Sequence, residues 1–247
     1  MEKDYFVNRV SVRNFGVRHI EMEKLTDIIE RAMRAPTCGN MQLYSVVVTR
    51  DDEMKTKLSA MHFNQPASTG CDVILTICAD FNRFTRWCEL SNAVPGYDNF
   101  HSFVSALTDA VIFAQQIVTI AEMEGLGTCY LGTVNYNAAD ISALLELPDL
   151  VVPVASLAVG YPIGTDQQVE RLPVAAVVHL EKYRKDSDEE LLALFKDKEE
   201  CDANKKFVKD NGKQSLASVF TDIRYPKAMN EKVSKDFLKL LESKKFL

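Results

Sequence analysis

The chain has 247 residues, which is enough for one large domain or two small ones with a sizeable core. Hydrophobic residues make up 47%, charged residues 26%, and the net charge is −6, so the composition is that of a soluble globular protein and argues against general nucleic-acid binding. No apolar run approaches the ~20 residues of a membrane span, and no signal peptide is expected. Six scattered cysteines without a C-x-x-C pair argue against zinc or disulfides and favour a cytoplasmic location.

The first chemical pattern lies near the N-terminus, where Arg9, Ser11 and Arg13 occupy alternate positions. In an extended backbone, alternate side chains point to the same side, so these three would converge. Two guanidinium groups and a hydroxyl suit a phosphate group. A solvated surface strand with unrelated arginines is the alternative interpretation.

An amphipathic helix is predicted over Glu21–Ala35, and Pro36 ends it. A loop of small and polar residues, Ala35–Gln42, then leads into a predicted strand at Tyr44–Thr49. Backbone N–H groups and short polar side chains in such a loop can face a heteroaromatic ring, although an ordinary turn has the same composition. We do not expect Cys38 to be a nucleophile, because no Cys/His motif accompanies it.

The middle of the chain predicts a short helix over Asp51–Met61 and a nearly continuous apolar strand over Cys71–Ala79. Such a strand is typical of a central position covered on both faces. Phe100–Glu124 has the strongest helical pattern, with apolar residues almost all round. This helix should be buried in a large core or against a partner subunit, so we expect a dimer. His62 is interpreted as a surface or structural residue rather than a catalytic one.

Two later segments, Gly125–Gly132 and Val151–Pro162, place small and β-branched residues between glycines. The backbone can then come close to a flat or phosphorylated ligand, although a buried strand ending in a turn would have the same pattern. A further strand is predicted over residues 171–180, with Arg171 at its base. Beyond Lys182, charge runs and amphipathic stretches predict an exposed helical extension.

No G-x-G-x-x-G or P-loop fingerprint is present, which leaves a mononucleotide held in another way. The chain resembles the nitroreductase family of FMN-dependent oxidoreductases. The resemblance covers about residues 5–183 and rests on Arg9-x-Ser11-Val12-Arg13-x-Phe15, Ala35–Gln42, Gly125–Gly132, Val159–Pro162 and Arg171-Leu172-Pro173. The tail is similar to the C-terminal extension of the branch with oxygen-insensitive NADPH nitroreductases and NADPH–flavin oxidoreductases.

The resemblance implies a three-layer α+β fold with a central, mainly antiparallel sheet flanked by helices. Residues 1–183 would form the FMN-binding domain, and residues 184–247 a helical C-terminal extension packed on it. Two chains would form an intertwined homodimer with FMN at the interface, without nucleic-acid or membrane partners. No catalytic side chain and no metal are implied, because the flavin carries the chemistry.

The resemblance also assigns the site residues. The FMN phosphate would be held by Arg9, Ser11, Arg13 and Arg171. The isoalloxazine ring and ribityl chain would be bordered on one side by Pro36, Thr37, Cys38, Asn40 and Gln65, and on the other by Tyr130, Leu131 and Gly132. Departures from the pattern occur at Val10 and Val169, where an arginine and a lysine are common, so the phosphate pocket would be weaker. Cys38 replaces the usual serine.

The implied activity is an NAD(P)H-dependent reduction of nitroaromatics, quinones or flavins by an alternating, ping-pong use of one open pocket over FMN. The donor would be NADPH or NADH. Candidates for contact with the NADPH 2′-phosphate are Lys205, Lys206, Arg224 and Lys227. The alternative is an FMN-binding protein of the same fold with a different flavin task or with no reductase turnover.

Overall fold

The computed structural model describes residues 3–164 and 166–247. The chain divides into two compact units. The first, which we call the sheet unit, comprises Met1–Gln167 and Val233–Leu247, and the second, the helical unit, comprises Gln168–Lys232.

Four antiparallel strands form the sheet, in the order β1-β2-β4-β3. Their bounds are β1 (Tyr44–Thr49), β2 (Val73–Asp80), β3 (Gly127–Tyr130) and β4 (Val151–Gly160). The two central strands, β2 and β4, are buried along their whole length, as the apolar run of β2 predicts. The expected α+β class with an antiparallel sheet is confirmed.

Strand β4 contains a proline although it is central. Ile77 of β2 pairs with Ala155, and the next residue, Cys78, pairs with Pro153, so Val154 has no direct partner. Proline cannot donate to the hydrogen-bond ladder and is tolerated inside a sheet at such a bulge. Pairing resumes beyond it, which keeps both central strands joined to their ends.

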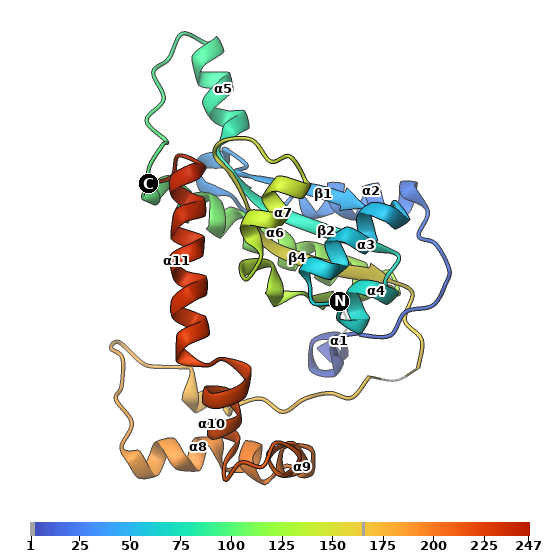
Figure 1. Cartoon of the computed structure of the whole chain (residues 1–247), viewed down its shortest axis with the longest axis vertical. Coiled ribbons are helices and arrows are strands. Elements are labelled where there is room, and N and C mark those ends of the chain that lie inside the picture. The colour runs from blue at the N-terminus through green and yellow to red at the C-terminus, as the bar shows by residue number, and fades with distance from the viewer. Residues whose placement is uncertain (1–2, 165) are drawn as a thin grey trace. The chain divides into compact units, whose positions relative to one another are not determined.

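Helices cover both faces of the sheet (Figure 1). One core is shared by β2, β4 and the helices α2 (Met22–Ala32), α6 (Phe100–Met123) and the C-terminal part of α11 (Lys227–Ser243). The opposite face is covered by α3 (Asp52–Met61), α4 (Pro66–Gly70) and α7 (Ala138–Leu144). Successive strand residues point to opposite faces, so Leu75 enters the first core and Ile74 the second.

Helix α6 is capped at its start by Asn99, whose side chain accepts the N–H of Ser102 at 3.0 Å. One face of the helix is buried in the first core. Its opposite face is exposed within one chain and carries uncharged side chains: Val104, Thr108, Val111, Ile112 and Gln115. Among the described residues, α6 alone is long and apolar enough to cross a membrane, by length and composition only, as core helices can be.

The remaining helices of the sheet unit are α1 (Lys3–Asn8) and α5 (Asn82–Leu90). With the loop that follows it, α5 extends beyond the sheet (Figure 1). An aromatic stack anchors its base, where the rings of Phe81 and Tyr97 lie 4.5 Å apart. This loop, residues 91–99, has no regular structure until α6 begins.

The helical unit contains α8 (Asp188–Glu200), α9 (Asp202–Asp210) and α10 (Leu216–Val219). Its helix α8 begins with a capping box, in which Ser187 and Glu190 each bind the backbone N–H of the other. The Arg224 guanidinium lies over the Phe207 ring, 4.9 Å from the centroid. Helical structure in this part of the chain agrees with the pattern predicted beyond Lys182.

The strand predicted over residues 171–180 is wrong. Residues Val174–Ala176 form a single 3-10 turn, closed by the N–H of Ala176 donating to the carbonyl of Pro173 at 2.9 Å, and no strand follows before Lys182. An apolar run alone does not distinguish a strand from other structure, and a strand also needs an edge to pair with.

The N-terminal residues that follow α1 form an isolated bridge, between Phe15 and Pro162.

Candidate active site

Arg9 is fixed at the C-terminal end of α6 by Glu122. The Nη2 and Nε atoms of Arg9 each lie 3.1 Å from a carboxylate oxygen of Glu122. The Tyr5 hydroxyl donates to the same carboxylate at 2.8 Å, and the Thr128 hydroxyl donates to it as well. Because the Glu122 side chain is only 9% exposed, its charge needs these partners. Burial, followed by Glu122, raises the pKa of Tyr5 to about 12, so its hydroxyl stays protonated.

The N-terminal segment lies against the edge strand β3. Val12 donates its N–H to the Thr128 carbonyl at 2.9 Å. The approach is so close that a Cβ on Gly127 would come within 2.7 Å of the Val12 side chain. Only glycine permits such a contact here. This contact places the N-terminal segment beside β3, and with it Arg9, Val10, Ser11 and Arg13.

The charges of Arg9 and Arg13 act on the titratable groups of this strand. Burial raises the pKa of the Cys129 thiol, while Arg13 and Arg9 oppose the rise. Burial likewise raises the pKa of Tyr130 to about 12, again opposed by Arg9. Arg13 itself is exposed; its N–H donates to Asp166 at 3.1 Å and its Nη1 to the Ser11 carbonyl at 3.4 Å. We call this place the cationic corner: Arg9, Ser11, Arg13 and Tyr130.

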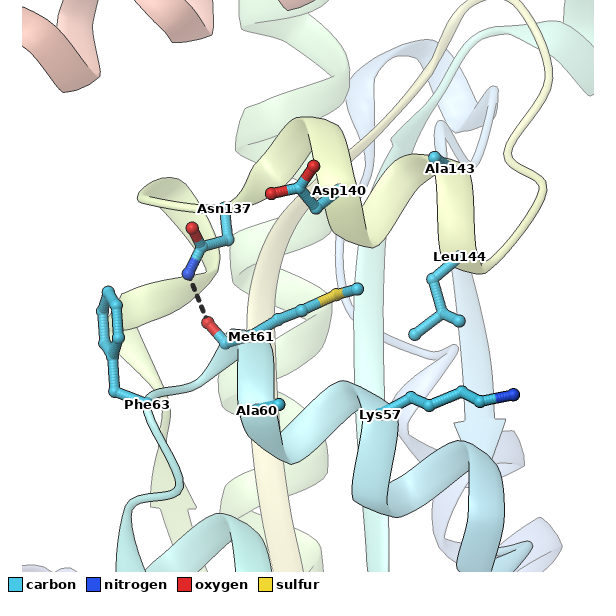
Figure 2. Close-up of a pocket in the computed structure, with 8 residues that line it drawn as sticks. All are labelled: Lys57, Ala60, Met61, Phe63, Asn137, Asp140, Ala143 and Leu144. Carbon is cyan, nitrogen blue, oxygen red and sulfur yellow. Dashed lines mark hydrogen bonds between the residues drawn. The ribbon is translucent and has the colours of Figure 1, made fainter.

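Two hydrogen bonds join the turn before α4 to the loop after β3. The Nδ1 atom of His62 lies 2.8 Å from the Thr133 hydroxyl oxygen. The side chain of Asn137 donates to the Met61 carbonyl at 2.5 Å (Figure 2). Three residues after His62 comes Gln65, and Ala67, two residues further, lies in the same core cluster as Leu131. Apart from Gly132 and its two chain neighbours, no atom of the described residues lies within 4 Å of the position that a Cβ on Gly132 would take.

A cavity of about 680 Å³ lies between α3 and α7 (Figure 2). Its lining is Lys57, Ala60, Met61, Phe63, Asn137, Asp140, Ala143 and Leu144. None of the residues that the sequence predicted for the site is among them. Met61 and Asn137, which are joined by a hydrogen bond, both line this cavity.

The predicted ring-facing residues Pro36, Thr37, Cys38 and Asn40 lie before β1. Pro36, Cys38 and Asn40 are exposed, and Thr37 is half-buried. Gly39 and Asn40 have φ angles of 53° and 55°, in the left-handed region. The Cys38 thiol is free.

The sheet separates this loop from the cationic corner. Strands β1 and β3 are opposite edges. Tyr44 is level with Ala79 and hence with Val152, near the first end of β4, whereas β3 pairs with residues 157–160. Three strand spacings of about 4.8 Å and five residues of about 3.3 Å give a diagonal of roughly 20 Å. One chain therefore does not bring the two groups together.

Arg171 belongs to the helical unit, where its Nη1 donates to the carbonyls of Val169 at 3.2 Å and Glu170 at 3.0 Å. Its contribution to the phosphate pocket stays a prediction. Asp109 and Glu122, which were not predicted from the sequence, hold residues of the two predicted groups. The available signal was that α6 has no other acidic residue, since a carboxylate in a buried helix requires partners.

An antiparallel sheet between helical layers defines an α+β fold, and its cationic corner and small-residue loop are the candidate cofactor contacts. The sequence matches the model of the nitroreductase family over residues 7–82 and 90–161. The chain belongs to the nitroreductase family, as the sequence predicted.

Individual relatives agree with this assignment. A Cr(VI) reductase of Pseudomonas sp. (strain G-1) is 32% identical over 231 residues, covering 92% of this chain and 94% of the relative. An FMN reductase (NADPH) of Bacillus subtilis (strain 168) is 31% identical over 188 residues, 74% of each chain. The crystal structure of a candidate oxidoreductase from Bacteroides fragilis NCTC 9343 is 45% identical, with a TM-score of 0.97 over 99% of both chains.

The buried His62 makes stability depend on pH. Burial lowers the pKa of His62 from 6.5 to about 4. The unfolded chain therefore takes up a proton that the native state excludes, so stability present above pH 6.5 is lost as the pH falls through 4, by at most about 3 kcal/mol. We expect denaturant titrations to show this loss, and His62→Gln, which keeps a polar side chain but does not titrate, to reduce it. An equal loss in the variant would contradict the prediction.

Proposed function

We propose that the protein is an FMN-dependent oxidoreductase that takes electrons from NADPH or NADH and passes them to nitroaromatics, quinones or flavins in alternate steps. Membership of the nitroreductase family and the relatedness to an FMN reductase support this proposal. The relatedness to a Cr(VI) reductase adds chromate to the acceptors that should be tried. The family assignment is the observation that carries the proposal.

The cationic corner fits the phosphate end of FMN. Arg13 is an exposed cation and Ser11 a half-buried hydroxyl, a pairing suited to a phosphate. Arg9 is paired with Glu122, and Val10 adds no charge. We therefore propose Arg13 and Arg171 as the main phosphate contacts, with Arg9 as support.

The open space beside Gly132 leaves room for a ligand to approach the backbone. Tyr130 and the backbone of Leu131, whose side chain is buried, would border the flavin on this side, and Pro36, Thr37, Cys38, Asn40 and Gln65 on the other. Bound FMN would supply the redox chemistry by accepting a hydride from the nicotinamide. The side chains would bind and orient it, so we propose no catalytic side chain.

We further propose a cytoplasmic homodimer with the site between subunits. The roughly 20 Å diagonal between loop and corner in one chain runs across the sheet, from one edge strand to the other, which supports a site completed by the loop of a second chain. The uncharged outer face of α6 is exposed in the single chain, with Val111 40% and Ile112 37% accessible. A second copy packed on that face would cover it and could bring its loop to the corner.

The function is tested by loading the protein with FMN and titrating it with NADPH and with NADH under anaerobic conditions. We expect the flavin absorbance band to bleach, and to return on addition of a nitroaromatic, a quinone or chromate. Retained flavin that neither donor bleaches would contradict the reductase and favour a flavin-binding protein without this turnover.

Two arginine variants test the proposed phosphate contacts. Arg13→Ala should weaken FMN binding by about 1.5–3 kcal/mol, the value of a charge-assisted hydrogen bond, and Arg171→Ala should do the same. Isothermal titration with FMN measures both. Arg184→Ala is the control, because this exposed arginine is paired with Asp186 at 2.6 Å. If Arg13→Ala and Arg171→Ala bind FMN as tightly as the control, these contacts are wrong.

The interface is tested by placing a charge on the outer face of α6. Val111→Asp should yield a monomer that loses FMN, because a carboxylate would be buried without a partner in the dimer. Thr56→Asp, at an exposed position of α3, is the control and should stay dimeric. Sedimentation and flavin content measure the outcome. A Val111→Asp protein that remains dimeric, or a monomer that keeps FMN, would sink the proposal.

A further inference from the structure

Two side chains from outside the ring-facing loop, residues 37–43, form hydrogen bonds to its backbone. Asp109 of α6 accepts the N–H of Cys38 at 2.8 Å and the N–H of Leu43 at 3.2 Å. Arg83 of α5 donates through Nη2 to the carbonyl of Gln42 at 2.6 Å and to that of Tyr44 at 2.9 Å. Asp109 thus accepts hydrogen bonds from backbone N–H groups of the loop. Arg83 donates to a carbonyl near the end of the loop and to the first carbonyl of β1.

The loop has a backbone that needs such support. Gly39, Asn40 and Gln42 have φ angles of 53°, 55° and 55°. Two of these residues are not glycine, and a side chain in the left-handed region costs about 1–2 kcal/mol. This conformation persists only where neighbouring groups fix it. Asp109 binds the loop on both sides of the three residues.

Asp109 lies where a charge is costly. Its residue is 2% exposed, in a part of α6 where Ala106, Ala110 and Phe113 are also buried. A carboxylate in such a place is stable only when its oxygens accept hydrogen bonds, and bonds from backbone N–H groups to a charged acceptor are among the strongest. Each oxygen of Asp109 accepts one bond from the loop.

Arg83 lies at the surface and is itself anchored. Its side chain is 57% exposed, and its Nη1 lies 3.6 Å from Asp80 and 3.2 Å from the Ser45 hydroxyl. Asp80 is 8% exposed at its side chain and also accepts the Ser45 hydroxyl and the N–H of Arg83. Asp80 and Ser45 therefore fix the orientation of the Arg83 guanidinium group that binds the loop.

We propose that Asp109 and Arg83 are positioning residues that preset the ring-facing loop for the flavin. The inference rests on the proposed function, in which this loop borders the FMN ring. Asp109 also lies on α6, whose outer face we propose as the subunit interface. The loop is thus tied to the element against which the partner subunit packs.

Hydrogen–deuterium exchange tests the proposal without any turnover. In the native protein without FMN, the amides of Cys38 and Leu43 should exchange slowly. Asp109→Asn removes the charge and replaces one acceptor with a donor, so both amides should exchange at least roughly tenfold faster. In the FMN-loaded protein, the variant should show a shifted flavin absorbance spectrum, because the ring wall has moved.

Asp72→Asn is the matched control. Asp72 is also a buried carboxylate, and it accepts the N–H of Ile20 at 2.8 Å, away from the loop. Its loss should lower the melting temperature without changing loop exchange or the flavin spectrum. A purely structural role for Asp109 predicts the same result for Asp109→Asn, and that result would overturn the proposal.

Arg83 provides a second variant, because an exposed side chain is replaced without disturbing the core. Arg83→Ala should speed loop exchange and shift the flavin spectrum, and Arg83→Lys should restore part of both. Native-like exchange and spectrum in Arg83→Ala would overturn its role even if Asp109→Asn does not fold. Should the native protein bind no FMN, the proposed function fails, while exchange in the flavin-free protein still decides whether the two residues position the loop.

Discussion

Two buried carboxylates on one apolar helix hold both parts of the proposed site. Asp109 binds the ring-facing loop, and Glu122 binds Arg9 of the cationic corner. The helix positions differ by 13 residues (122 − 109), which is about 20 Å of helix. Because a buried charge cannot be left without partners, each carboxylate fixes a segment far away in sequence. Helix α6 therefore keeps the ring-facing loop and the cationic corner apart within one chain. This separation supports the proposed dimer.

The titratable groups of the cationic corner and of the residues around it have simple charges at neutral pH. His62 is neutral, since burial lowers its pKa to about 4, and Tyr5 and Tyr130 are protonated, since burial raises theirs to about 12. The charge comes instead from the arginines and from Glu122. In the proposed function, side chains of this kind would orient the cofactor and leave the redox step to it.

Much of the fold could be predicted from local pattern. The strand Tyr44–Thr49 has the predicted bounds, and the apolar run of β2 indicated its central, doubly covered place. The strand expected after Arg171 failed because pairing is not a local property. Asp109 and Glu122 were missed for a related reason: their hydrogen-bond partners lie 66 to 117 residues away along the chain, apart from Thr128, so sequence spacing gives no sign of them.

In the proposed dimer, one flavin lies between the cationic corner of one chain and the ring-facing loop of the other. Mixing two defective proteins tests it directly: Arg13→Ala damages the corner, and Cys38→Trp fills the space before the exposed loop. If the site spans two chains, mixed dimers hold one doubly damaged and one intact site, so random mixing should restore about a quarter of the FMN sites. If mixed dimers form, as native mass spectrometry can show, and no FMN binding returns, the account is contradicted.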